Sequence, residues 1–221
     1  MLVAGKEVPM SLEELVDPAT TALVIVDIQN DYCATGGRYD KAGKDMSPYP
    51  AMIRETAALL GAARDRGVMR VFIQNLNRLD YRYDSPAQLR FKLHLRGVDP
   101  ERLPETEHAI EGSWGYAIVD ELTPRDDEPV VRKFRSSAFA GTELSLLLNS
   151  NGIRQVVVCG VVTEGCLMST AYHAHAEDFV VVLAEDCVGS GNPEAHEHAL
   201  ALMRLRFDTY TADDIVKAWS A

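Results

Sequence analysis

Short runs of apolar residues alternate along the chain with segments whose apolar residues recur at helical spacing. The apolar runs predict β-strands over residues 21–28, 68–75, 129–134, 154–160 and 179–187, with a short last strand after residue 207. The segments between them predict helices over residues 49–67, 141–153, 166–178 and 192–207. Because strands and helices alternate, the pattern predicts an α/β fold in which helices cover both faces of a parallel sheet.

Residues 78–118 fit this alternation poorly. They contain three prolines, several arginines and Trp114. We interpret them as an insertion of loops and short helices that lies over the sheet. The length of 221 residues then corresponds to a single domain, residues 1–221, with an insertion around 78–118.

Polar residues stand where the predicted strands end. In an open parallel sheet, ligands bind beyond the carboxyl ends of the strands. The residues at these ends are Asp27, Gln74, Asn75, Lys133, the turn that leads to Cys166, Asp186 and Cys187. An acid, a base and a thiol from distant parts of the sequence are therefore predicted to meet at one rim of the sheet.

Each of these three residues has an alternative interpretation. Asp27 is read either as a carboxylate that caps the next turn or as a catalytic group with Lys133 as its cation. Cys166 is read either as a nucleophile, whose thiolate the N-terminus of the following helix would stabilise, or as a buried residue that opens this helix. The other cysteines are interpreted as packing residues, and they are Cys33, Cys159 and Cys187.

Composition and charge narrow the function classes. The net charge of −11 and the pI of about 5.0 disfavour nucleic acid as a partner. No N-terminal signal and no membrane-spanning apolar run are recognised, so we expect a cytoplasmic protein with free thiols. The histidines form no HExxH or DxHxH motif, and we expect neither a metal nor another cofactor.

Three segments, residues 21–32, 130–139 and 156–174, together resemble the isochorismatase-like cysteine hydrolases. The resemblance implies a three-layer α/β/α fold around a six-stranded, mainly parallel, Rossmann-like sheet. It also implies a catalytic triad of Asp27, Lys133 and Cys166. The family carries a cis peptide bond before its nucleophile, which would be Val161–Val162 here, and an oxyanion hole formed by the N–H groups of Val162 and Cys166.

Cys166 favours the amidohydrolase branch of this family. Nicotinamidases in that branch carry a metal-binding DxHxH, and the matching residues 73–84 contain no histidine. Residues 31–47, 74–75 and 112–124 look like those of ureidoacrylate amidohydrolases, with biuret hydrolases and N-carbamoylsarcosine amidohydrolases as neighbouring groups. The resemblance therefore implies hydrolysis of a carbamoyl C–N bond.

The leading hypothesis is an amidohydrolase that cleaves a small ureido or carboxamide compound through a thioester-like intermediate. The substrate contacts predicted with it are Tyr32, Asn75 and Trp114, and the candidate arginines for a substrate carboxylate are Arg78, Arg82, Arg90 and Arg96. The alternatives are a vinyl-ether hydrolase of the isochorismatase type and a non-catalytic interaction protein. Homo-oligomers are usual among the proteins that the chain resembles, so we expect a homo-oligomer.

Overall fold

A six-stranded sheet forms the centre of the protein in this computed structural model, which describes residues 1–220. The strand order is β5-β4-β3-β6-β7-β8, and every neighbouring pair is parallel. The strands are β3 (Thr21–Val26), β4 (Met69–Asn75), β5 (Val130–Lys133), β6 (Gln155–Val161), β7 (Val180–Gly189) and β8 (Asp208–Tyr210). The predicted α/β class is confirmed.

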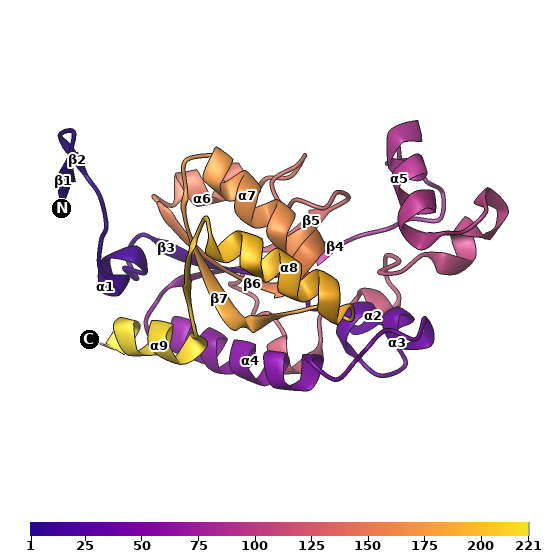
Figure 1. The fold of residues 1–221 in the computed structure, drawn as a ribbon, viewed down its shortest axis with the longest axis horizontal. Helices are drawn as coiled ribbons and strands as arrows, with labels where there is room; N and C mark the ends of the chain where they lie inside the picture. Colours follow the sequence, from indigo (N-terminus) through magenta and orange to yellow (C-terminus); the bar gives the residue numbers. More distant parts are fainter. Residues whose placement is uncertain (221) are drawn as a thin grey trace.

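Helices cover both faces of this sheet (Figure 1). One face packs against α4 (Tyr49–Asp65) and α9 (Ala212–Ser220), and the other packs against α6 (Leu144–Ser150), α7 (Met168–Ala176) and α8 (Pro193–Arg204). Alternate residues of β3 point into the two apolar layers, since Leu23 and Ile25 join the first and Val24 and Val26 the second. Every residue of β3 and β6 is buried, which explains their continuous apolar sequences.

The centre of the sheet is tight where β3 and β6 end. Gly160 pairs with Val26 and has φ +121°, and a Cβ atom placed on it would lie 2.0 Å from the Val26 carbonyl oxygen. Glycine is therefore required at this point of close backbone approach. The two segments that carry Asp27 and Cys166 leave the sheet directly beyond this contact.

The remaining elements are short. They are β1 (Leu2–Val3), β2 (Lys6–Glu7), α1 (Leu12–Leu15), α2 (Asn30–Cys33), α3 (Arg38–Lys41), α5 (Pro86–Arg96), η1 (Pro100–Thr106), η2 (Trp114–Tyr116), η3 (Asp120–Leu122) and η4 (Thr163–Leu167). The strands β1 and β2 form an antiparallel hairpin that extends away from the sheet (Figure 1). The elements α2 and α3 lie at the carboxyl ends of the strands, beside the site described below.

The segment that contains α5 and η1 projects from the body as a lobe (Figure 1). Its neck is closed by a bridge between Asn77 and Ile110 and by an ion pair of 2.5 Å between Arg78 and Glu111. Inside the lobe, the buried Lys92 ammonium lies 3.0 Å from Asp84 and 3.1 Å from Glu107. Paired charges therefore occupy the interior of this lobe, where a free-standing domain would place apolar side chains.

Candidate active site

Asp27 leaves β3 at the rim predicted from the sequence. Its backbone adopts φ +54°, its N–H donates to the Ile73 carbonyl at 3.0 Å, and its carbonyl accepts from the Gln29 N–H at 2.8 Å. A positive φ is uncommon for a residue with a side chain, and here the neighbouring strand holds it in place. This bend ends the strand at Val26, and the Asp27 carboxylate is buried.

Lys133 is the last residue of β5 and is fully buried. Its Nζ lies 2.7 Å from Asp27 Oδ2, and it donates to the Arg135 carbonyl at 3.0 Å and to Cys166 Sγ at 3.1 Å. A lysine ammonium has three N–H donors, so each donor has one acceptor. The Lys133 ammonium thus contacts both the Asp27 carboxylate and the Cys166 thiol, so the three predicted residues lie together.

Cys166 differs from the other cysteines in exposure. Its side chain is half-buried, whereas Cys33, Cys159 and Cys187 are buried. The Cys159 thiol is 3.8 Å from the Val24 carbonyl within the sheet, in agreement with its interpretation as a packing residue. Of the four cysteines, the one that contacts Lys133 is therefore the one that is partly exposed.

Burial and the neighbouring charges set the protonation of the triad. Burial raises the pKa of Cys166 to about 12, and the Asp27 charge adds to this rise while Lys133 opposes it. Burial also raises the pKa of Asp27, although Lys133 counteracts part of that rise. Burial alone would lower the pKa of Lys133, but the charges of Asp27 and Cys166 outweigh it and the pKa is raised. Lys133 and Asp27 thus form an ion pair beside a thiol whose pKa is raised.

The turn before Cys166 departs from the predicted helix. The regular helix α7 begins at Met168, and Cys166 lies in the preceding turn η4. Gly165 interrupts the helix with φ −113° and ψ −105°, and a Cβ atom there would lie 2.9 Å from Val162 Cγ2. The peptide bond Val161–Val162 is cis, as the resemblance implied.

Tyr32 and Asn75 lie beside the triad and contact each other. Asn75 Nδ2 donates to the Tyr32 hydroxyl at 2.6 Å. Gln29 fixes the Asn75 backbone from both sides, since its Oε1 accepts from the Asn75 N–H at 2.9 Å and its Nε2 donates to the Asn75 carbonyl at 3.0 Å. Sequence reasoning missed Gln29; its place two residues after a strand-ending aspartate was the available signal.

Two further aromatic side chains, those of Tyr39 and His108, pack against Tyr32. The Tyr32 ring meets the rings of Tyr39 and His108 edge to face, with centroids 5.1 Å away in both cases. Burial, with a smaller contribution from the Arg96 charge, lowers the pKa of His108 to about 3, so this ring is neutral at physiological pH. Neither Tyr39 nor His108 was predicted, because Tyr39 lies in the short helix α3 and His108 in a loop, and the strand pattern determines the position of neither segment.

The isochorismatase domain family matches residues 21–214 of this chain. The chain is 36% identical over 188 residues to the ureidoacrylate amidohydrolase of Methylorubrum extorquens. The aligned region covers 83% of this chain and 76% of that protein. The chain belongs to the isochorismatase family. This membership confirms the resemblance carried by the segments around Asp27, Lys133 and Cys166.

Solved structures agree with the family assignment. An isochorismatase-like hydrolase from Alkaliphilus metalliredigens superposes with a TM-score of 0.71 at 27% identity, covering 91% of this chain and 99% of that one. An N-carbamoylsarcosine amidase from Thermoplasma acidophilum superposes with a TM-score of 0.68 at 22% identity, covering 88% and 97%. The second likeness shows a shared fold. The predicted six-stranded α/β/α architecture is thereby confirmed as that of the isochorismatase family.

The other predicted contacts of this isochorismatase-family site are exposed or already paired. The Trp114 side chain is 57% exposed, and its backbone carbonyl accepts from Asn30 Nδ2 at 3.0 Å, so its place as a pocket wall stays a prediction. Among the arginines considered, Arg78 pairs with Glu111 and Asp80, and Arg96 pairs with Glu107. Arg82 and Arg90 are exposed.

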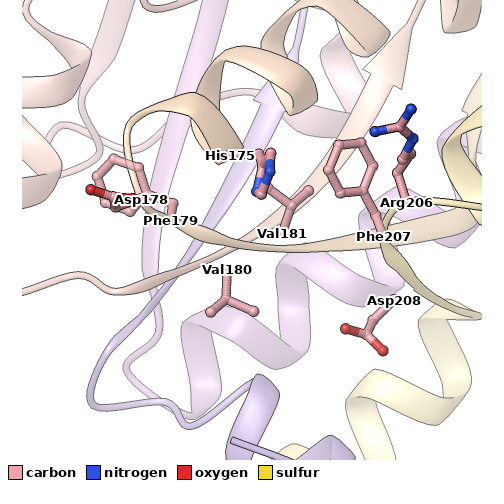
Figure 2. A pocket seen from close by; sticks show the side chains of 8 residues that line it. All are labelled: His175, Asp178, Phe179, Val180, Val181, Arg206, Phe207 and Asp208. Carbon is pink, nitrogen blue, oxygen red and sulfur yellow. The ribbon is translucent and has the colours of Figure 1, made fainter. Parts of the chain in front are cut away.

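A separate surface cleft of about 320 Å³ lies at the opposite rim of the sheet (Figure 2). It is lined at the starts of β7 and β8 by residues that include Val180, Phe207 and Asp208. Because all strands are parallel, this rim is the one remote from Asp27 and Lys133. The cleft is therefore not part of the candidate active site.

Within residues 1–220, no three His, Cys, Asp or Glu side chains are grouped so that they could hold a metal ion. None of the helices in the same range combines the length and the apolar character that crossing a bilayer requires.

Proposed function

We propose that this protein is a cysteine-dependent amidohydrolase that cleaves the C–N bond of a small ureido or carboxamide compound. The observation that carries the proposal is the single Lys133 ammonium, which contacts both the Asp27 carboxylate and the Cys166 thiol. Relatives named ureidoacrylate amidohydrolase, at 36% identity, favour a ureidoacrylate-like substrate. A thiol, a base and a fixed cation in one half-buried site are the groups that nucleophilic acyl transfer needs.

In the first step, Asp27 removes the thiol proton as Cys166 Sγ attacks the substrate carbonyl carbon. The two electrons of the C=O π bond move to the oxygen, giving a tetrahedral oxyanion. Lys133 keeps Asp27 ionised before the transfer and offsets the charge that develops on sulfur, which is why one cation serves both groups. Because burial raises the pKa of Cys166, a base such as Asp27 is needed to remove the thiol proton.

In the second step, the oxyanion collapses and the C–N bond breaks. Protonated Asp27 donates its proton to the leaving nitrogen, so ammonia or an amine departs and an acyl group remains on sulfur. Asp27, again ionised, then takes a proton from water as the water oxygen attacks the acyl carbon. Collapse of this second oxyanion breaks the C–S bond and returns the proton to the thiol.

The oxyanion is assigned to the backbone N–H groups of Val162 and Cys166. The Val162 carbonyl accepts from the N–H groups of Gly165 at 3.0 Å and Leu167 at 3.3 Å, which fixes the turn that presents these donors. Preorganised donors of this kind typically contribute about 10²–10³ in rate each. Tyr32 and Asn75 are assigned to the substrate, and the buried Tyr32 hydroxyl, whose pKa burial raises, stays neutral as a hydrogen-bonding group.

A substrate screen tests this proposal. We expect the purified protein to hydrolyse at least one member of a panel that contains ureidoacrylate, biuret, N-carbamoyl amino acids, maleamate and nicotinamide, measured by release of ammonia. Iodoacetamide at one equivalent is expected to abolish that activity and to modify Cys166, because the other thiols are buried. Peptide mass mapping identifies the labelled cysteine. Activity that survives complete alkylation of Cys166 would contradict the cysteine mechanism.

We further propose that the protein works in the cytoplasm as a homo-oligomer assembled through α5. The only buried residue of α5 is Lys92, while Phe91 and Leu95 are 46% and 66% exposed one helical turn apart. Arg90 lies beside this apolar face, and the chain as a whole has a net charge of −11. The acidic surface of a second copy is therefore a complementary partner for this face.

The double substitution Phe91→Ser and Leu95→Ser tests this assembly. We expect light scattering coupled to size-exclusion chromatography to show an oligomer for the wild type and a smaller species for the variant, because an interface loses its apolar contacts. Leu202→Ser, at a residue on α8 that is 53% exposed, serves as the matched control. A wild-type monomer, or an unchanged mass in the α5 variant, would overturn the assembly through α5.

A further inference from the structure

The turn η4, which carries Cys166, lies beside the segment that joins β7 to α8. Val161 at the end of β6 pairs with Gly189 at the end of β7, so the two chains leave the sheet side by side. One chain continues through η4 to Cys166, and the other continues through Ser190 to the cap of α8 at Asn192. Side chains of residues 190–196 can therefore contact η4 directly.

Two side chains of this segment bind consecutive residues of η4. The hydroxyl of Thr163, which is fully buried, lies 2.8 Å from His196 Nδ1. The buried Ser190 hydroxyl donates to Glu164 Oε1 at 2.9 Å. An imidazole Nδ1 accepts from a hydroxyl when the ring proton is on Nε2, and it donates to the hydroxyl oxygen when Nδ1 itself is protonated. The contact between Thr163 and His196 is therefore available to either tautomer.

The segment that supplies these side chains is itself held in place. The Ser190 oxygen accepts from the Asn192 N–H at 3.1 Å. Asn192 caps α8, because its Oδ1 accepts from the Ala195 N–H at 3.2 Å and its carbonyl accepts from the His196 N–H at 2.9 Å. His196 thus reaches Thr163 from the first turn of a capped helix, whose own hydrogen bonds do not involve η4.

The turn η4 is not a regular helix and benefits from such support. Gly165 has non-helical dihedral angles between Glu164 and Cys166, and α7 begins only at Met168. A shift of the backbone at Thr163 would move the Cys166 sulfur, which lies 3.1 Å from Lys133 Nζ. It would also move the neighbouring N–H groups to which the oxyanion is assigned. The contacts of Thr163 therefore bear on the geometry of attack.

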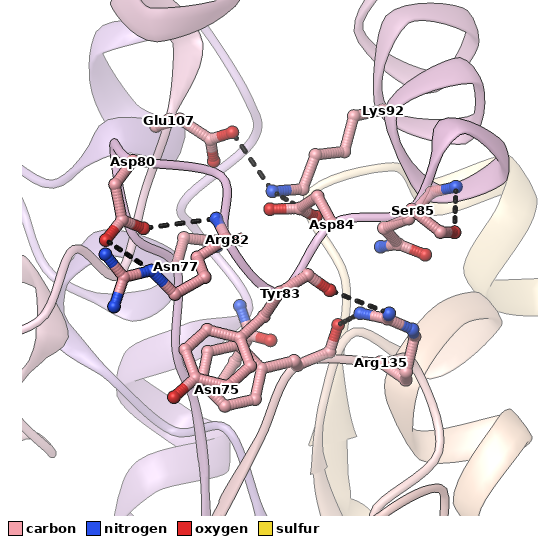
Figure 3. A network of polar contacts seen from close by, with 12 residues as sticks. Asn75, Asn77, Asp80, Arg82, Tyr83, Asp84, Ser85, Lys92, Glu107 and Arg135 are labelled. Atoms are coloured by element: carbon pink, nitrogen blue, oxygen red, sulfur yellow. Dashed lines mark hydrogen bonds and ion pairs between the residues drawn. The ribbon is translucent and has the colours of Figure 1, made fainter.

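The opposite side of the site is held by the lobe. Arg135 Nη2 donates to the Tyr83 carbonyl at 2.8 Å (Figure 3), and the Tyr83 ring stacks on the Phe134 ring with centroids 4.3 Å apart. The Arg135 carbonyl in turn accepts from Lys133 Nζ at 3.0 Å. These contacts fix the cation of the site, whereas the contacts from α8 fix the turn of the nucleophile. A substitution at His196 is therefore expected to disturb the thiol more than the ion pair.

We propose that His196 is a positioning residue, which holds η4 through Thr163 so that the Cys166 thiol and its neighbouring N–H donors face one substrate carbonyl. Ser190 supports the same turn through Glu164. This inference rests on the proposed amidohydrolase function and adds to it the residue that orients the nucleophile. Small misplacements of reacting groups cost large factors in rate, so a contact behind the turn affects catalysis without touching the substrate.

Kinetics on the best substrate of the screen test this role. His196→Ala is expected to lower kcat about 10- to 100-fold and to change KM less than about threefold, because the attack is misaligned while ground-state binding persists. His196→Asn keeps a hydrogen-bonding atom attached to Cγ, as Nδ1 is, and should recover most of the rate. His196→Gln places its amide one carbon farther out and should recover little. His198→Ala is the matched control, since His198 is an exposed residue of the same helix, and it should keep the wild-type kcat.

A double-mutant cycle shows whether His196 acts through Thr163. Thr163→Val removes the hydroxyl with little change of shape and is expected to lower kcat by a similar factor. His196→Ala added to Thr163→Val should then cause no further loss. Additive losses, an unchanged kcat in His196→Ala, no recovery in His196→Asn, or an equal loss in His198→Ala would each overturn the positioning role.

Alkylation of Cys166 by iodoacetamide separates this inference from the proposed function, because it requires no substrate. The Lys133 charge favours the thiolate, so a displaced sulfur should react more slowly. We expect the rate of Cys166 labelling to fall about threefold or more in His196→Ala and to stay at the wild-type value in His198→Ala. A wild type that hydrolyses no panel compound would overturn the amidohydrolase function, and the labelling rates would still decide the role of His196. A wild-type labelling rate in His196→Ala would overturn that role.

Discussion

Replacing Cys166 with alanine is expected to reduce turnover by at least about 10⁴-fold while the protein keeps its fold. In the proposed mechanism the acyl group is transferred to this sulfur, and the other three thiols are buried. Stability should change by no more than about 1 kcal/mol, because Lys133 keeps two of its three acceptors, Asp27 and the Arg135 carbonyl. Initial rates on the best substrate of the screen and urea unfolding measure the two effects.

Cys159→Ala provides the comparison, since it removes the same atoms seven positions earlier in the chain. Its thiol is buried in β6, so the expected result is the reverse: some stability is lost and the rate is nearly retained. A Cys166→Ala protein with wild-type kcat/KM would refute nucleophilic catalysis by this thiol. Loss of activity in Cys159→Ala comparable to that in Cys166→Ala, without unfolding, would show that the two sulfurs do not have the separate roles assigned to them.

The strand-end residues were predictable because a parallel sheet places all its carboxyl ends at one rim. Apolar runs identify the strands, and the polar residue after each run then falls at that rim, as Asp27 and Lys133 do. The contact among Asp27, Lys133 and Cys166 follows from a strand order that the alternation of strands and helices alone does not give. It was expected only through the resemblance of the surrounding segments to a known family.

The residues that sequence reasoning missed come from segments without regular periodicity. Tyr39 reaches Tyr32 from a short helix, and His108 reaches it from the lobe. The start of α7 was misplaced because Gly165 adopts a conformation that interrupts helical hydrogen bonding, which an apolar pattern does not reveal. Such positions depend on backbone turns and on buried polar contacts, which are fixed only in the folded chain.

The sequence predicted the type of structure in the lobe but not which of its side chains are buried. Its sequence predicted loops and short helices, and α5 and η1 are short helical segments. The burial of Lys92 between Asp84 and Glu107 was not predicted, because a lysine in a helix is usually read as solvent-exposed. Recognising that the apolar face of α5 is the outer one required the structure, and this reversal is the basis for the proposed assembly.

Replacing Lys133 with methionine is expected to have the largest combined effect on activity and stability. The substitution leaves Asp27, which is 1% exposed, without its cation, and an uncompensated buried charge typically costs about 3–5 kcal/mol. Turnover should fall by at least about 10³-fold, because no charge then balances the thiolate that forms during attack. Urea unfolding at pH 7 and initial rates measure these losses.

The stability loss should depend on pH in a defined direction. Burial raises the pKa of Asp27 even in the wild type, and without Lys133 the rise is larger. A carboxyl group whose folded pKa lies above its unfolded value, about 3.9, stabilises the fold fully below that value and loses this contribution as the pH rises through the folded pKa. Lys133→Met should therefore be closest to wild-type stability near pH 4 and weakest above neutrality.

The double variant Asp27→Asn with Lys133→Met should recover most of the stability at pH 8 and none of the activity, because it removes the unpaired buried charge but also the proposed base. If the single and double variants were equally stable across this pH range, Asp27 would not be the buried anion that Lys133 holds, and the central ion pair of the proposed mechanism would have to be abandoned.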